Sequence, residues 1–189
     1  MGIWPVGKGS RLNRILTIRW SGQLTDGLFQ SALASFVLFS PERAPNAVSA
    51  ALAFSVVLLP YSLIGPYVGT FLDRFSRQRI IRNCNYVRAA NLLIIAWLIN
   101  NSSTGIILTL FVLFAFGVNR LILSGLSAGL PLLVKKEELI AANALAVTGG
   151  TIWVVIGGGI GIAIKNLLSK NADADYADAV VVLVASMGF

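Results

Sequence analysis

Long apolar runs constrain this chain more than any other feature. Five stretches of about 20 residues or more carry few charges, and a sixth, shorter stretch follows them; the six cover residues 20–40, 47–68, 80–99, 105–134, 141–168 and 176–189. A membrane-crossing helix needs about 20 mostly apolar residues. The runs lack the alternation of a half-buried strand and exceed the usual length of strands. We therefore predict an all-α, polytopic membrane helix bundle.

The composition excludes several other classes of protein. Charged residues make up 12% of the 189 residues, and the mean hydropathy is +0.79. Soluble domains carry roughly 25% charged residues, so a water-soluble globule is not expected. Histidine is absent and Cys84 is the single cysteine, which argues against zinc sites and an internal disulfide. We expect no metal, no cofactor and no enzymatic activity.

The basic residues predict the orientation of the chain in the membrane. With the N-terminus in the cytoplasm, eleven Lys and Arg residues fall on interior segments and three on exterior ones. This bias matches the positive-inside rule. We expect a multi-pass protein of the cell (plasma or inner) membrane, with a basic cytoplasmic arm at 1–14 and the helical part at 15–189. This orientation explains the basic clusters without nucleic acid as a partner, and membrane lipid is the expected partner of the chain.

A short turn between the second and third runs carries an unusual charge pattern. It combines an acid with several bases. The residues that define the pattern are Gly69, Asp73, Arg74, Arg77 and Arg79. Acids contribute little to topology, so Asp73 needs another explanation, such as a charge-assisted network with the arginines. The turn resembles the signature loop of the major facilitator superfamily, G-x-x-x-D-R-x-G-R-[KR]. Ser76 and Gln78 depart from that pattern. The resemblance implies that this loop gates the cytoplasmic side.

Other segments resemble bacterial drug and siderophore exporters of the same superfamily. They are residues 22–30, 58–66 and 133–145, and residues 157–161 match part of the antiporter segment G-P-x-x-G-G, with Gly158 in place of proline. The resemblance covers 15–189. It implies the N-terminal six-helix half of a major-facilitator fold, with the sixth helix truncated and the C-terminal half missing as a partner.

Asp26 is the most informative single residue. It shares one stripe of the first helix with Gln23 and Gln30, and a charge at mid-helix costs roughly 2.5–3.5 kcal/mol on insertion. Its position suggests a proton relay or a contact with a cationic substrate; an acid paired with an arginine, such as Arg19, is the alternative. Arg120, within the fourth run, would contact a substrate anion or pair with Asp26. A purely structural pair is also open for Arg120.

Glycines spaced four residues apart predict smooth helix surfaces. These are Gly65 and Gly69, Gly125 and Gly129, and Gly157 and Gly161. Such pairs let helices approach closely in membranes. Sliding contacts of a rocking transporter and plain tight packing are both compatible with this spacing.

These observations lead to one functional expectation and three alternatives. We expect a secondary active transporter that exports a small lipophilic compound by alternating access, coupled to protons. Because the sixth run covers only part of a bilayer, the chain is expected to be an incomplete fragment. The alternatives are an inactive half-transporter, a structural membrane subunit that does not transport, and a polytopic membrane enzyme, against which the scattered acids argue.

Overall fold

The computed structural model describes residues 10–38, 76–101, 106–170 and 173–188, which are helical apart from short connections. The helices are α1 (Ser10–Leu38), α4 (Arg77–Asn100), α5 (Ile106–Gly129), α6 (Leu139–Leu168) and α7 (Ala174–Ser186), with the short 3-10 helices η1 (Leu130–Leu132) and η2 (Lys136–Glu138) between α5 and α6. Five of the six predicted runs correspond to these five α-helices. The run at 47–68 lies outside the described residues.

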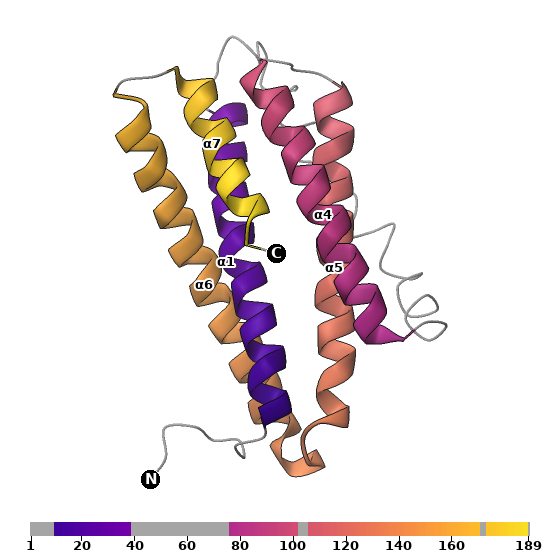
Figure 1. The fold of residues 1–189 in the computed structure, drawn as a ribbon. Helices are drawn as coiled ribbons and strands as arrows, with labels where there is room; N and C mark the ends of the chain where they lie inside the picture. Colours follow the sequence, from indigo (N-terminus) through magenta and orange to yellow (C-terminus); the bar gives the residue numbers. More distant parts are fainter. Residues whose placement is uncertain (1–9, 39–75, 102–105, 171–172, 189) are drawn as a thin grey trace.

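The helices run up and down along a common direction (Figure 1). α1 packs along α6, and α4 packs along α5. The short helix α7 contacts both α1 and α4 and so joins the two pairs. α1 and α5 touch little. The described part is therefore a bundle of two helix pairs with α7 between them at one end.

The first helix begins earlier than the sequence suggested. α1 starts at Ser10, whereas the apolar run starts at residue 20 and a basic arm was expected over 1–14. Leu12 and Leu16 are buried against Leu130, Ala142 and Ala146. Leu12 and Leu16 form an apolar face on the basic segment. Burial of this face stabilises the segment as part of α1 despite its arginines.

The turn between α5 and α6 begins inside the predicted run at 105–134, so the helix is shorter than that run. α5 ends at Gly129, and η1 follows with Pro131 near its start. Proline lacks the backbone N–H that an interior helix position donates, so the regular helix ends here. The chain then reverses through η1 and η2 into α6.

The buried apolar core lies mainly in the end of the bundle that holds α7. α1, α4, α5 and α7 all contribute to it, among others through Phe29, Ile95, Phe116 and Val181. The rings of Phe29 and Phe116 lie 5.8 Å apart between their centroids. Smaller apolar clusters lie toward the other end of the bundle. They lie between α1 and α6 and between α4 and α5. Polar side chains occupy the level between these clusters.

Two described segments are long and apolar enough to cross a membrane, Ile107–Leu132 and Lys136–Leu168. α6 leaves much of its apolar surface uncovered, including Ile152, Val155, Ile162 and Leu167. An apolar face of this extent is suited to lipid or to another helix rather than to water.

Candidate functional site

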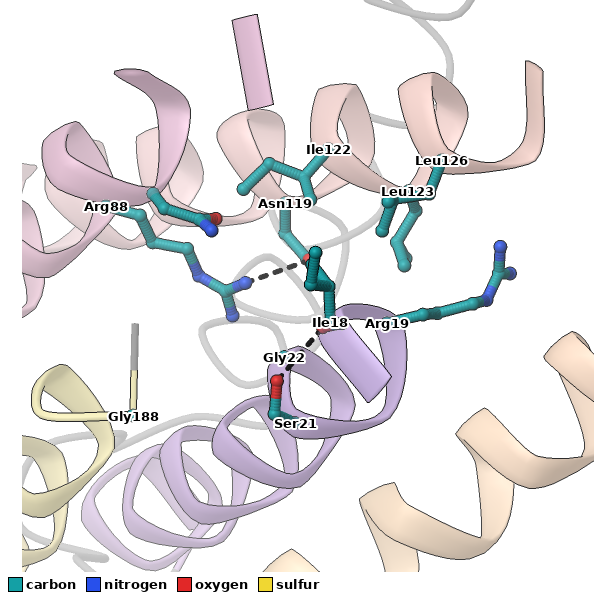
Figure 2. A pocket seen from close by; sticks show the side chains of 11 residues that line it. Ile18, Arg19, Ser21, Gly22, Arg88, Asn119, Ile122, Leu123, Leu126 and Gly188 are labelled. Atoms are coloured by element: carbon teal, nitrogen blue, oxygen red, sulfur yellow. Dashed lines mark hydrogen bonds between the residues drawn. The ribbon is translucent and has the colours of Figure 1, made fainter. Parts of the chain in front are cut away.

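Asp26 of α1 and Arg88 of α4 form an ion pair inside the bundle. Asp26 is 3% exposed and Arg88 is 2% exposed. Arg88 Nη1 also donates a hydrogen bond to Asn119 Oδ1 of α5, with 3.1 Å between the atoms. Figure 2 shows the side chains of Arg88 and Asn119 pointing toward each other. One carboxylate, one guanidinium and one amide thus connect three helices.

The surroundings make this pair difficult to dissociate. Leu28 and Phe29 of α1, and Leu92 of α4, belong to the main apolar core next to it. In such a low-dielectric setting, removing one partner leaves an uncompensated buried charge. Asn91 Nδ2, one turn further along α4, donates to the carbonyl of Phe111 at 2.9 Å. This bond holds α4 against α5 beside the ion pair.

A pocket of about 140 Å³ lies beside the ion pair, between α1, α4 and α5. Arg88, Asn85 and Asn119 contribute polar groups to its lining, and Figure 2 shows Arg88 and Asn119 there. Its apolar lining comes mainly from Ile18, Ile122, Leu123 and Leu126. A space of this size holds several water molecules or a small ligand group.

Arg19 lines the same pocket from α1. It is 8% exposed, and its Nη1 donates to Ser127 Oγ of α5 at 2.9 Å. Its Nε has no hydrogen-bond partner among the described residues. In Figure 2 the side chain extends away from Arg88. Two buried arginines therefore lie on different sides of one pocket.

The predicted pathway residues are not all brought together. Asp26 is buried, Gln23 is half-buried beside Gly150 of α6, and Gln30 is exposed. Arg120 is exposed on α5. The neighbouring residue Asn119 reaches the ion pair instead.

The arginine that pairs with Asp26 was not identified from the sequence. The sequence pointed to Arg19 and Arg120 as possible partners of Asp26, and not to Arg88. A signal was present, since Arg88 lies inside the run at 80–99 and Asn91 follows at i+3 on the same helix face.

Most of the predicted gating loop lies outside the described residues, namely Gly69, Asp73 and Arg74. Arg77 is the first residue of α4, but its side chain also lies outside the described part. Arg79 is exposed in the first turn of α4. The gating role of this loop stays a prediction.

The glycines of α6 lie in its contact with α1. A Cβ atom on Gly157 would overlap the carbonyl oxygen of Leu24, and one on Gly161 would overlap the side chain of Ser31. From the other side, Gly27 lies equally close to the carbonyl of Val154. These positions let the two backbones approach each other directly.

Of the two predicted glycines of α5, Gly129 has looser surroundings than the two predicted glycines of α6. Gly125 is buried. A Cβ atom on Gly129 would meet Ile15 at an ordinary 3.7 Å. Gly65 lies outside the described residues.

Comparison with known proteins finds relatives that are named as transporters. Over 172 residues, which are 91% of this chain, the sequence is 35% identical to uncharacterized MFS-type transporters of Mycobacterium tuberculosis and Mycobacterium bovis. Over the matched residues, the chain is similar to transporters of the major facilitator superfamily. This confirms the resemblance found in the sequence. The matched part spans 38% of the length of these relatives.

A more distant relative has a more specific name. Macrolide efflux protein A of Streptococcus pyogenes is 26% identical over 125 residues, which cover 64% of this chain and 30% of that protein. No protein-family model matches the chain. No solved structure matches it either.

Proposed function

We propose that the chain forms the N-terminal helix bundle of a proton-coupled exporter of small lipophilic compounds. The buried ion pair of Asp26 and Arg88 carries this proposal, because an ionisable pair among membrane helices is costly and typically marks an ion pathway. The similarity to MFS-type transporters supports transport as the activity.

Proton uptake at Asp26 would change the contacts that Arg88 makes with α1 and α5. Protonation neutralises the carboxylate, so the attraction between α1 and α4 is lost and Arg88 keeps its hydrogen bond to Asn119. A two-state protein responds by shifting toward the conformation that binds the proton better. Gln23, Gln30 and Arg120 belong to the proposed pathway as polar residues that a substrate meets on α1 and α5.

The distribution of charge supports a cytoplasmic N-terminus in the cell membrane. The end of the bundle where α1, α4 and α6 begin carries Arg14, Arg79, Arg82, Lys135 and Lys136. The opposite end has Lys165 in the last turn of α6, followed by Lys170. The basic end would face the cytoplasm, with the loop of Asp73 and Arg74 as its gate.

Alternating access in this family uses two halves related by an axis along the membrane normal. A second helix bundle is therefore the proposed partner of this chain. The exposed apolar face of α6 offers surface for lipid or for that partner. A macrolide is the first compound to test as a substrate, given the name of the streptococcal relative.

Transport is tested in proteoliposomes with an imposed pH gradient. The chain is reconstituted alone and fused to the remaining part of the mycobacterial relative, and movement of a labelled macrolide and of a panel of lipophilic dyes is followed. We expect gradient-dependent flux in the fusion, abolished by D26N and retained by D173N, which changes an exposed acid at the start of α7.

Each outcome separates the proposal from its alternatives. Flux in the fusion but not in the chain alone identifies an inactive half-transporter. Absence of flux from both, with folded protein, favours a structural subunit and rejects transport. Undiminished flux in D26N rejects the proton relay.

A further inference from the structure

We infer that Arg79 and Arg82 of α4 bind the phosphate of an anionic phospholipid, whose acyl chain lies along the outer face of this helix. The inference goes beyond the proposed function, because such a site would exist whether or not the chain transports. It is also more specific than contact with a bilayer in general, since it names one class of headgroup and one place on the bundle.

The outer face of α4 forms one continuous stripe. Five exposed residues at intervals of three or four positions make up this stripe, namely Arg79, Arg82, Tyr86, Ala90 and Leu93. Residues at this spacing lie on the same side of a helix. The opposite side of α4 is buried, for example at Ile80, Arg88, Leu92 and Ile95. Packing of that side against the bundle therefore turns the stripe outward, where lipid would lie.

The basic end of the stripe has no balancing acid on its own helix. α4 contains neither Asp nor Glu, and among the described residues no carboxylate forms an ion pair with Arg79 or Arg82. Positive side chains are unfavourable in the first turn of a helix. Lys135 and Lys136, at the same end of the bundle, are instead followed directly by two glutamates. An anion at the start of α4 would offset a charge that its neighbours leave uncompensated.

The rest of the stripe fits the apolar part of a lipid. Tyr86 is 68% exposed and Leu93 is 49% exposed. From Arg82 to Leu93 the helix rises about 16 Å, which is about half of a hydrocarbon core of roughly 30 Å. Tyrosine is enriched near the level of the headgroups. The stripe thus leads from two cations past an aromatic ring into the depth of one leaflet.

The two arginines suit a phosphate group. They lie three positions apart, on neighbouring turns of one face, so both guanidinium groups can donate to oxygens of the same phosphate. Their long apolar stems can lie along the helix while the charged groups reach the headgroup region. A zwitterionic lipid also carries a phosphate, but its own cation would be repelled here. The site therefore favours a lipid with net negative charge.

Binding is measured on the purified full chain in a neutral detergent. Palmitoyl-oleoyl phosphatidylglycerol is titrated in mixed micelles; phosphatidylcholine with the same chains, and inorganic phosphate at constant ionic strength, are titrated separately. The midpoint of thermal unfolding is recorded, because a ligand of the folded state raises it in a saturable way. Native mass spectrometry counts the lipid molecules that stay bound.

We expect a saturable rise of the midpoint with phosphatidylglycerol, a smaller one with phosphatidylcholine and none with inorganic phosphate. R79Q/R82Q should weaken binding of phosphatidylglycerol by about tenfold or more, since each basic residue near the headgroups contributes. R79K/R82K keeps the charge but loses the planar fork of donors, so it should retain part of the affinity. The matched control K135Q/K136Q removes the same charge from the same end of the bundle and should bind as the unmodified chain does.

A second variant separates a lipid site from general attraction to a charged micelle. Y86A leaves both arginines in place and removes the ring beside them, so it should weaken binding of phosphatidylglycerol, whereas general attraction would be unchanged. Arg79, Arg82 and Tyr86 are exposed, so without lipid these variants should unfold close to the midpoint of the unmodified chain.

Several results would overturn the inference. They are equal binding by R79Q/R82Q and the unmodified chain, an equal loss in K135Q/K136Q, and equal affinity for the two lipids. Unchanged binding by Y86A would replace the site with general attraction of charges. A rise of the midpoint with inorganic phosphate that matches the rise with phosphatidylglycerol would identify a free anion as the ligand instead.

The lipid site and the proposed transport fail separately. Lipid binding without flux in the fused transporter rejects transport and retains the site. Flux in the fused transporter without selective binding of phosphatidylglycerol retains transport and rejects the site.

Discussion

Gly157 of α6 lies in direct contact with the backbone of Leu24 on α1. The contact continues one turn further, where Gly161 meets Ser31, and it is matched from α1 by Gly27 against Val154. The two helices are thus held at a separation that side chains would not allow. Small residues at helix contacts have this effect in membranes.

Replacing Gly157 with alanine should destabilise the bundle. The added methyl group must displace the backbone of α1, and overpacking of this kind costs about 1–3 kcal/mol. We expect the midpoint of thermal unfolding of G157A in detergent to fall below that of the unmodified chain.

G159A is the matched control, since a Cβ atom there meets no atom within 4 Å. Alanine favours a helix over glycine by up to about 1 kcal/mol, so this variant should be unchanged or slightly more stable. Equal midpoints for the two variants would show that α1 and α6 do not pack as described.

Breaking the ion pair of Asp26 and Arg88 should be more damaging than removing it. D26N and R88Q each leave one buried charge without its partner, and such single changes typically cost about 3–5 kcal/mol. The double variant D26N/R88Q leaves neither charge and should recover a large part of this loss. Denaturation of the three variants in mixed micelles measures the coupling, and additive losses would rule out the pairing.

Asn119 and Arg120 should respond differently to alanine substitution. Asn119 accepts a bond from the buried Arg88, so N119A should lose about 1–3 kcal/mol of unfolding free energy. Arg120 is exposed, and changes at exposed positions usually stay within about 0.5 kcal/mol. A larger loss in R120A than in N119A contradicts this assignment of the two residues.

The orientation can be tested with single cysteines in intact cells. Cys84 is first changed to serine, and N101C and K136C are then introduced at opposite ends of the bundle. A membrane-impermeant maleimide should label N101C from outside, whereas K136C should react only after permeabilisation. The reverse pattern would place the N-terminus outside the cell.

The sequence predicted the long helices well because long apolar runs have few alternatives to helices in a membrane. The predicted runs at 80–99 and 141–168 agree closely with α4 (Arg77–Asn100) and α6 (Leu139–Leu168). The start of α1 was missed, since its basic residues concealed an apolar face that becomes evident only when Leu12 and Leu16 meet α6.

The site was predictable only in part. The cost of a charge at mid-helix singled out Asp26, but periodicity describes one helix and says nothing of its partner on another. Neighbouring helix residues point about 100° apart, so the choice between Asn119 and Arg120 depends on how α5 is rotated. That rotation is set by packing, which also decides that Arg88 rather than Arg120 faces Asp26.

The attachment of α7 has a mechanical consequence. This helix touches α1 and α4, and the bond between Lys165 and Asp178 fastens it to α6 as well. It extends over only one end of the bundle (Figure 1). The two helix pairs are therefore linked at both ends, by α7 at one end and by the turn through η1 and η2 at the basic end, which restricts spreading of the pairs at either end.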